Sequence, residues 1–344
     1  MKRFARNHWY VAAWSSEVGE RPLARRLLGE PVVLFRQEDG SIAALTDRCP
    51  HRLVPLSMGA CVNGRIRCGY HGMEFDAAGR CVHIPAQTLI PPRAQVRSFP
   101  VLKRYGLVWL WMGDPGMASP DAVPPVEKYG VRGWDALEGG YQYHPSSYLN
   151  IIENLMDPAH TTFVHRTTIG NPLAADKPVT MEKGAGYVVA YRWLENTQPS
   201  AHDRTRADFG DSSVDRGNFF YFRLPCTSQV ETVVLPAGQE RTEENMSKGM
   251  RTYSYKFLTP ESESATHFFW LHIRNYQIGD HKAAATLRVA LEQTFLEDLE
   301  IEAAMQRSQE ETGMRQLVAL EIDRAPTLAL RMLERMIEAE ATSR

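Results

Sequence analysis

Two short mixed pairs of cysteine and histidine lie within residues 47–76. One residue separates Cys49 from His51, two separate Cys68 from His71, and sixteen residues lie between the pairs. Zinc is the first metal to consider, because cysteine and histidine at such spacings commonly bind it. Structural zinc sites, however, usually pair like ligands on each arm. One thiolate and one imidazole on each loop instead suit a two-iron cluster with Cys₂ on one iron and His₂ on the other, since each loop then reaches both irons.

The residues around these pairs agree with a cluster more than with zinc or a chance pairing. Gly69 and Gly72 flank the second pair, where the backbone must pass close to the sulfur atoms, and Pro50 stiffens the first. Imidazole in place of thiolate also raises the reduction potential of such a cluster. The other cysteines lack a matching histidine neighbour and are expected to be small buried hydrophobic residues: Cys61, Cys81 and Cys226.

A second candidate metal site lies in the segment NIIENLMDPAHTTFVH, residues 150–165. His160 and His165 are five residues apart, which sets them roughly 140° apart on a straight α-helix at about 100° per residue. They converge on one ion only if the helix deforms or ends between them. Two imidazoles and one carboxylate with positions left open form the facial triad of non-haem Fe(II). Two nearby histidines alone are more often surface or core residues, so this interpretation depends on the motif upstream.

The third ligand is sought on the helix expected over residues 287–305. Its apolar stripe is expected to comprise Leu287, Leu291, Phe295, Ile301 and Met305. At 100° per residue, Asp298 falls at the centre of this stripe, Glu302 lies about 40° away, and Glu297 and Glu300 fall well outside it. A carboxylate that faces a core is costly unless it is paired, hydrogen-bonded or bound to metal. Asp298 is therefore the predicted ligand and Glu302 the reserve, against the alternative of an ordinary helix carboxylate.

Composition excludes several classes of protein. The chain has 344 residues, 43% hydrophobic and 23% charged, with a formal net charge of −2. This charge gives no reason to expect nucleic acid or an anionic membrane as a partner. No apolar run approaches the length of a membrane-spanning helix, and no secretory signal is expected at the N-terminus. The odd number of cysteines argues against a secreted disulfide framework. A cytoplasmic protein is expected.

Two parts of the chain, with different patterns of expected secondary structure, must position these residues. Residues 1–115 read as short strands and turns, and Asn63-Gly64 between apolar runs indicates a hairpin. A Pro-rich connector over residues 113–125 marks the boundary. Strand-like runs follow at 186–194, 218–224, 252–258 and 266–273, and helical periodicity extends over 282–341 with a break near Pro326. We therefore expect an all-β domain over 1–115 and an α+β domain over 116–344.

Together these stretches resemble the oxygenase component of the Rieske non-haem iron oxygenases. The resemblance is strongest to the aromatic O-demethylase branch, which includes vanillate O-demethylase and dicamba monooxygenase, and it spans nearly the whole chain. It rests on the cluster motif and on five further segments: NHWYVAAW, KRYGLVWLW (103–111), NLMDPAH, FLTPE (257–261) and FLEDLE (295–300). It implies a Rieske [2Fe–2S] domain and a helix-grip catalytic domain, in which an antiparallel sheet wraps around a long helix.

The resemblance also implies a role for each candidate residue. Cys49, His51, Cys68 and His71 would hold the [2Fe–2S] cluster, and His160, His165 and Asp298 the mononuclear Fe(II). Asn154 matches a polar residue that lines the iron site. Asp157 matches a bridging aspartate between a cluster histidine of one subunit and His160 of the next; the alternative is a helix N-cap before Pro158.

The implied reaction is the use of O₂ and electrons from a separate NAD(P)H-dependent reductase or ferredoxin to oxidise an aromatic compound. Hydroxylation of an aryl methyl ether gives a hemiacetal that collapses to a phenol and formaldehyde. No Gly-rich dinucleotide fingerprint follows a strand, so the nicotinamide cofactor is expected on the partner. Domains of this size have radii of gyration of about 13 Å and 17 Å, so their centres should lie on the order of 30–40 Å apart within one chain. A head-to-tail homotrimer is expected to supply a closer cluster.

The sequence indicates the substrate less specifically than it indicates the type of reaction. Residues 170–250, which build much of the pocket, share little with the family. Lys256 lies where similar demethylases place a pocket residue and would suit an aromatic carboxylate or sulfonate, although strand lysines are usually solvated; Tyr253 and Tyr255 are expected in the core. O-demethylation is the leading hypothesis. A ring-, methyl- or N-methyl-hydroxylating relative is the second, and a non-catalytic electron-transfer or zinc-binding protein the third.

Overall fold

The computed structural model describes residues 4–166, 168–199, 201–204, 206, 209–210 and 212–342. The chain divides into two compact units. The first comprises residues 1–123 with two short later pieces, 259–263 and 340–344, and the second comprises residues 124–258 and 264–339. This division falls after Val123, inside the Pro-rich connector and eight residues beyond the expected boundary at 115. No helix among the described residues is long and apolar enough to cross a membrane.

The first unit is built from three small antiparallel sheets, in the orders β1-β10-β9, β2-β3-β4 and β5-β6-β7-β8. Its strands are β1 Trp9–Trp14, β2 Leu23–Leu27, β3 Glu30–Arg36, β4 Ile42–Thr46, β5 Ala60–Val62, β6 Arg65–Arg67, β7 Glu74–Phe75, β8 Cys81–His83, β9 Val101–Arg104 and β10 Leu107–Trp111. Three 3₁₀ turns are η1 Leu56–Met58, η2 Pro115–Met117 and η3 Pro120–Ala122. The all-β expectation for this part of the chain is confirmed.

The expected Asn-Gly hairpin connects β5 and β6. Asn63 and Gly64 both have positive φ, 48° and 67°, as a two-residue hairpin turn requires. The hairpin packs over a buried cluster that includes Phe35, Leu56, Ile66 and Phe75. This core supports the two loops that carry the cysteine–histidine pairs.

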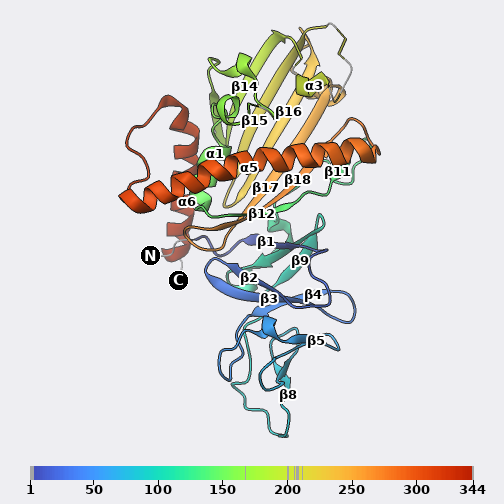
Figure 1. Cartoon of the computed structure of the whole chain (residues 1–344), viewed down its shortest axis with the longest axis vertical. Coiled ribbons are helices and arrows are strands. Elements are labelled where there is room, and N and C mark those ends of the chain that lie inside the picture. Colours follow the sequence, from blue (N-terminus) through green and yellow to red (C-terminus); the bar gives the residue numbers. More distant parts are fainter. Residues whose placement is uncertain are drawn as a thin grey trace. The chain divides into compact units, whose positions relative to one another are not determined.

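The second unit contains an eight-stranded antiparallel sheet in the order β11-β18-β17-β16-β15-β14-β13, with β12 also paired to β18 (Figure 1). Its strands are β11 Asp135–Leu137, β12 Tyr141–His144, β13 Thr180–Gly184, β14 Tyr187–Thr197, β15 Val214–Arg223, β16 Thr227–Pro236, β17 Met250–Pro260 and β18 Thr266–Arg274. The four strand-like runs predicted here correspond to β14, β15, β17 and β18. The fold class is therefore the expected α+β arrangement.

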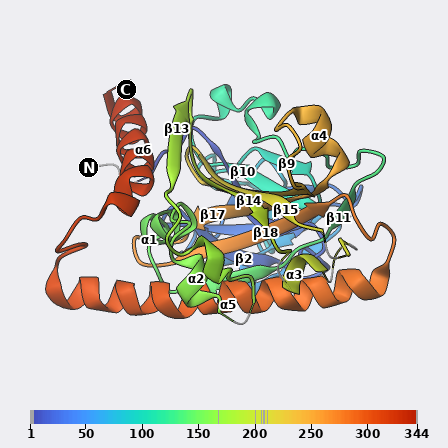
Figure 2. The same cartoon turned by 90° about the horizontal axis from the view of Figure 1, so that it is seen from above.

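One long helix, α5 (His281–Thr312), lies across a face of this sheet (Figures 1 and 2). The Asp280 side chain caps its N-terminus by accepting from the backbone N–H groups of Lys282 and Ala283, and Gly313 ends it in the left-handed conformation at φ 68°. Phe295 of α5 packs against Phe268 and Trp270 of β18, with ring centroids 5.3 and 5.4 Å apart. Helix and sheet thus share one core.

The remaining helices are short, apart from the last. They are α1 Tyr148–Leu155, α2 Thr161–Val164, η4 Pro172–Ala174, α3 Ala201–Arg204, α4 Glu243–Lys248, η5 Glu321–Asp323 and α6 Arg324–Thr342. The break expected near Pro326 was misplaced, because the chain leaves the helix at Gly313 and Pro326 lies in the first turn of α6. Proline is tolerated there, since its missing N–H would have no partner in the first turn.

Candidate metal and substrate sites

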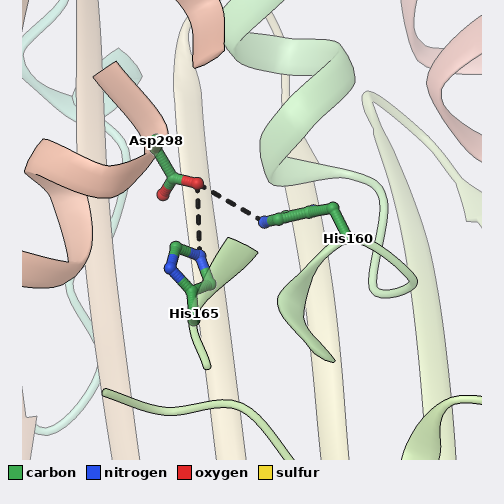
Figure 3. A group of neighbouring side chains, drawn as sticks. All are labelled: His160, His165 and Asp298. Atoms are coloured by element: carbon green, nitrogen blue, oxygen red, sulfur yellow. Dashed lines mark ion pairs between the residues drawn. The ribbon is translucent and has the colours of Figure 1, made fainter. Parts of the chain in front are cut away.

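The second unit brings together the three predicted iron ligands. Asp298 Oδ1 lies 3.5 Å from His160 Nε2 and 3.2 Å from His165 Nε2 (Figure 3). One donor atom from each of the three residues lies within 4.8 Å of the others, close enough to bind a single ion. Two imidazole nitrogens and one carboxylate oxygen are the donor set of a facial triad. The residues therefore fit a mononuclear non-haem iron.

The two histidines lie at opposite ends of one short helical turn that is separate from the helix before it. α1 stops at Leu155, and the next helix, α2, is a single turn over Thr161–Val164. His160 is the N-cap of this turn and His165 its C-cap. Their rings lie 5.3 Å apart between centroids, at an interplanar angle of 70°. The expected end of a helix between the histidines is that of α2, which stops at Val164, just before His165.

Asp298 is held as a carboxylate despite its burial. Only 5% of the residue is exposed. Burial opposes ionisation, but hydrogen bonds and charge from His160 and His165 hold the pKa of its carboxyl below the ordinary value. The Asn154 amide donates to Oδ1 at 3.2 Å. The side chain predicted to line the iron site thus contacts the carboxylate.

The reserve carboxylate, Glu302, is not part of this group. It is 1% exposed and its Oε2 lies 2.6 Å from Nδ1 of His144, which is completely buried. Burial raises the pKa of Glu302. Both carboxylates of the predicted stripe therefore face the core. Ile301, by contrast, was wrongly assigned to the stripe and is 44% exposed.

The Asp157 side chain closes a local turn within its own chain and caps no helix, because α2 begins at Thr161 with His160 as its N-cap. Its Oδ1 accepts from the N–H of Ala159 at 2.7 Å, while Oδ2 lies 3.9 Å from Nδ1 of His160. That ring nitrogen is instead hydrogen-bonded to the backbone carbonyl of Asp157, at 2.5 Å. The Asp157 side chain keeps 21% of its surface exposed.

A cavity of about 1080 Å³, including its mouth, opens beside the three ligands. The apolar part of its lining includes Leu155, Ile169, Val230, Leu291 and Phe295. The sheet contributes a polar row across adjacent strands, because Arg192, Asn218, Thr232 and Thr252 are cross-strand neighbours in register. The cavity thus has apolar side chains of α5, Leu291 and Phe295, next to Asp298, and polar groups along the sheet.

Lys256 lies inside this cavity and not in solvent. The residue is 4% exposed, and its Nζ has one hydrogen bond to another described residue, to the Ser254 carbonyl at 3.4 Å. Its Nζ also lies 5.6 Å from the centroid of the Phe295 ring. Burial lowers the pKa of Lys256 to about 7, and the nearby Asp298 acts in the opposite direction. Tyr253 and Tyr255 alternate with it and are completely buried, as predicted.

In the first unit, the two cysteine–histidine loops present their four donors together. Cys49 and Cys68 are each 2% exposed, whereas His51 and His71 are exposed with Nδ1 atoms 3.1 Å apart. Burial raises the pKa of the Cys49 thiol, and the neighbouring Cys68 acts in the same direction, so paired thiolates here need a cation. Two inner sulfurs and two outer imidazoles fit a [2Fe–2S] cluster bound through Cys₂ and His₂.

Backbone geometry closes these two loops. The N–H of Cys49 donates to the Val54 carbonyl, and that of Cys68 to the Met73 carbonyl, both at 2.8 Å. Gly72 has φ of 71°, a conformation that favours glycine. Cys81 and Cys226 are buried, as expected. Cys61, which was also expected to be buried, is partly exposed.

Two family models match the chain, one over each unit. Residues 8–100 match the Rieske [2Fe-2S] domain family, and residues 145–339 match the family described as Vanillate O-demethylase oxygenase C-terminal domain. The chain belongs to the Rieske non-haem iron oxygenases of this group. It is the oxygenase component of a monooxygenase system and carries a Rieske [2Fe–2S] cluster and a mononuclear iron. An oxygenase component receives its electrons from a separate reductase.

Three relatives illustrate the range of the group. The chain is 34% identical to a putative toluene-4-sulfonate monooxygenase iron-sulfur subunit of Comamonas testosteroni, over 97% of each chain. It is 35% identical to the dicamba O-demethylase oxygenase component of Stenotrophomonas maltophilia, over 98% of this chain and 99% of the relative. The crystal structure of dicamba monooxygenase bound to 3,6-dichlorosalicylic acid aligns with a TM-score of 0.90 at 34% identity, covering 98% and 99% of the two chains.

Proposed function

We propose that this oxygenase component oxidises an anionic aromatic compound, and that the reaction is oxidative O-demethylation of an aryl methyl ether. The burial of Lys256 beside the proposed iron ligands supports an anionic substrate, and the match to the vanillate O-demethylase family, with a dicamba O-demethylase among the relatives, supports the demethylation. A buried ammonium is costly unless it is paired. An aromatic carboxylate or sulfonate in the cavity would supply the missing charge, while Phe295 and Leu291 pack against its ring.

We assign the metal ligands as the sequence predicted. His160, His165 and Asp298 would hold the mononuclear iron, and Cys49, His51, Cys68 and His71 the [2Fe–2S] cluster. The iron, when bound, supplies the activation of O₂. Two electrons and two protons complete the reaction: one oxygen atom enters the methyl group and the other leaves as water. The resulting hemiacetal then breaks its C–O bond to give the phenol and formaldehyde.

The chain's own residues position the reactants. Lys256 would bind the substrate anion and thereby fix which end of the ring faces the ligands. Asn154 holds Asp298 through its amide, so that the carboxylate keeps one orientation while substrate enters. The apolar walls contributed by α5 exclude water from the reacting carbon.

A second candidate reaction is hydroxylation of an aryl methyl group. The relative that acts on toluene-4-sulfonate favours it, because that substrate combines an anion with a methyl group and has no ether. The same lysine would serve a sulfonate or a carboxylate. The two reactions differ in product, since only the ether releases formaldehyde.

We further propose that electrons come from an NAD(P)H-dependent reductase or ferredoxin in the cytoplasm, and that the protein is a homotrimer. The exposed imidazoles of His51 and His71 support transfer across a protein surface. In a head-to-tail ring, Asp157 would bridge a cluster histidine of one subunit and His160 of the next. For this bridge, Oδ2 of Asp157, which lies 3.9 Å from Nδ1 of His160, would have to take over the hydrogen bond that the Asp157 backbone carbonyl holds in the single chain, and also accept one from the cluster histidine.

The test is a product assay with matched substrates. The protein, with a reductase, would be given 4-methoxybenzoate, 4-methoxybenzenesulfonate, toluene-4-sulfonate and the neutral 4-methoxytoluene. We expect formaldehyde in proportion to O₂ consumed with the two anionic ethers, and little turnover of the neutral compound. Alcohol formation from toluene-4-sulfonate with no formaldehyde from either ether would instead establish the second reaction. A preference for the neutral compound would contradict the anion site.

A further inference from the structure

Both ring nitrogens of His165 face carboxylates, and these belong to consecutive residues of α5. Nε2 lies 3.2 Å from Asp298 Oδ1, the contact drawn in Figure 3, and Nδ1 lies 2.8 Å from Glu297 Oε2. The Thr168 hydroxyl donates to the same Oε2 at 2.7 Å. Glu297 lies outside the apolar stripe and has no part in the three-residue metal group.

The other histidine of the site is held differently. Nδ1 of His160 is hydrogen-bonded to the Asp157 backbone carbonyl, a neutral acceptor. The His160 side chain is 14% exposed, whereas that of His165 is 2% exposed. The site therefore contains one imidazole on a neutral acceptor and one, more deeply buried, on a carboxylate.

Helix geometry explains how one turn provides both carboxylates. Consecutive residues point about 100° apart around the helix. Asp298 faces the core, and Glu297 lies at the edge of the buried face with its side chain 16% exposed. The His165 ring fits between the two side chains with one nitrogen toward each. This arrangement fixes the orientation of the ring, because turning it over would withdraw Nδ1 from Glu297.

We propose that Glu297 is a positioning residue for the mononuclear iron site, acting through His165. Its carboxylate accepts a hydrogen bond from Nδ1–H, which keeps the proton on Nδ1 and leaves the Nε2 lone pair for the metal. Its negative charge also makes the imidazole a stronger electron donor. Thr168 holds the carboxylate in place. The inference rests on the proposed ligand set and adds to it a residue that does not touch the metal.

The experiment compares Fe(II) affinity among variants that retain the cluster. Glu297→Ala removes both acceptor and charge, while Glu297→Gln keeps an acceptor oxygen without the charge. Glu300→Gln is the matched control, because Glu300 is an exposed carboxylate on the same helix. Thr168→Val removes the hydroxyl that holds Glu297. The dissociation constant would be measured by chelator competition on protein whose visible Rieske absorption equals that of the wild type.

We expect Glu297→Ala to weaken Fe(II) binding about 10- to 100-fold, the usual effect of losing such a partner. Glu297→Gln should fall between Ala and wild type, Thr168→Val should have a smaller effect in the same direction, and Glu300→Gln should bind as wild type. Thermal unfolding of the variants with the cluster present and no mononuclear iron added checks that the fold is retained. Wild-type affinity in Glu297→Ala, or equal loss in Glu300→Gln, would overturn the inference. A wild type that binds no Fe(II) beyond its cluster would refute the proposed ligand set instead.

Discussion

At the scale of single residues, candidate donor side chains lie together at one place in each unit of the chain. His160, His165 and Asp298 converge, and the four cluster donors face one another in pairs. Short spacing within each motif indicated the cysteines and histidines, whereas Asp298 was indicated by helical periodicity in a distant segment. Glu297 could not be found in this way, since an apolar stripe ranks only the residues that face the core. Its position beside Asp298 was the one available signal, and that signal is weak.

Lys256 also shows what sequence periodicity does not reveal. Alternation along β17 separates it from Tyr253 and Tyr255, but both sets are buried, one in the core and one in a cavity. Sequence periodicity distinguishes the two faces of a strand and does not reveal that one face lines a cavity. The resemblance to the demethylases indicated a pocket position for this lysine, and the structure shows that the residue is buried there.

Replacement of Lys256 by methionine tests its proposed role. The change keeps the apolar length of the side chain and removes the charge. We expect KM for anionic aromatic substrates to rise roughly 10- to 100-fold, because a hydrogen bond to a charged group is worth about 1.5–3 kcal/mol. Lys248→Met is the control, since Lys248 is exposed on α4 and paired with Glu244. Equal KM values in wild type and Lys256→Met would contradict the role.

The pH dependence of KM provides a second measurement on the same residue. Burial lowers the pKa of Lys256 to about 7, with Asp298 of α5 opposing the shift, so the ammonium form is complete only below that pH. Raising the pH through 7 removes the proton and with it the attraction for an anion. KM for an anionic substrate should therefore increase above pH 7 in the wild type. It should not do so in Lys256→Met, nor for a neutral substrate.

At the scale of elements, α5 determines the site. It supplies Asp298 to the metal group, Glu297 to His165, and Phe295 to the cavity wall. The helix and its buried carboxylates were predictable from a period near 3.6 residues. Its end was not, because Pro326 was taken as the break while the left-handed Gly313 closes the helix. Gly313 was the better signal, since glycine commonly ends helices.

Mutation should distinguish the roles of the two buried carboxylates of α5, Asp298 and Glu302. Asp298→Ala removes a proposed ligand, so turnover should cease and iron should fall to the content of the cluster alone, with the Rieske spectrum unchanged. Glu302→Ala leaves the three donors but breaks the buried pair with His144, which should lower the free energy of unfolding by roughly 3–5 kcal/mol. Iron analysis and thermal unfolding measure the two effects. Activity kept in Asp298→Ala and iron lost in Glu302→Ala would place the ligand one turn later.

At the scale of the whole molecule, the pattern of strand-like and helical runs predicted an all-β unit followed by an α+β unit. The connector near residue 120 was also visible as a Pro-rich stretch. The assignment of residues 259–263 and 340–344 to the first unit was not predictable, because it depends on contacts between segments distant in sequence. The proposed exchange of electrons between subunits belongs to this scale.

Asp157→Asn tests that proposal. Asparagine retains a side-chain oxygen that can accept from the Ala159 N–H, so the local turn should persist, but the negative charge is lost. We expect both metals and the trimer to be retained and most turnover to be lost, with reduced clusters failing to discharge when substrate and O₂ are added. Stopped-flow absorbance of the cluster measures that step, and Asp176→Asn, at an exposed site, is the control. Near-normal turnover in Asp157→Asn, or full activity in a monomer, would show that electrons reach the iron by another route.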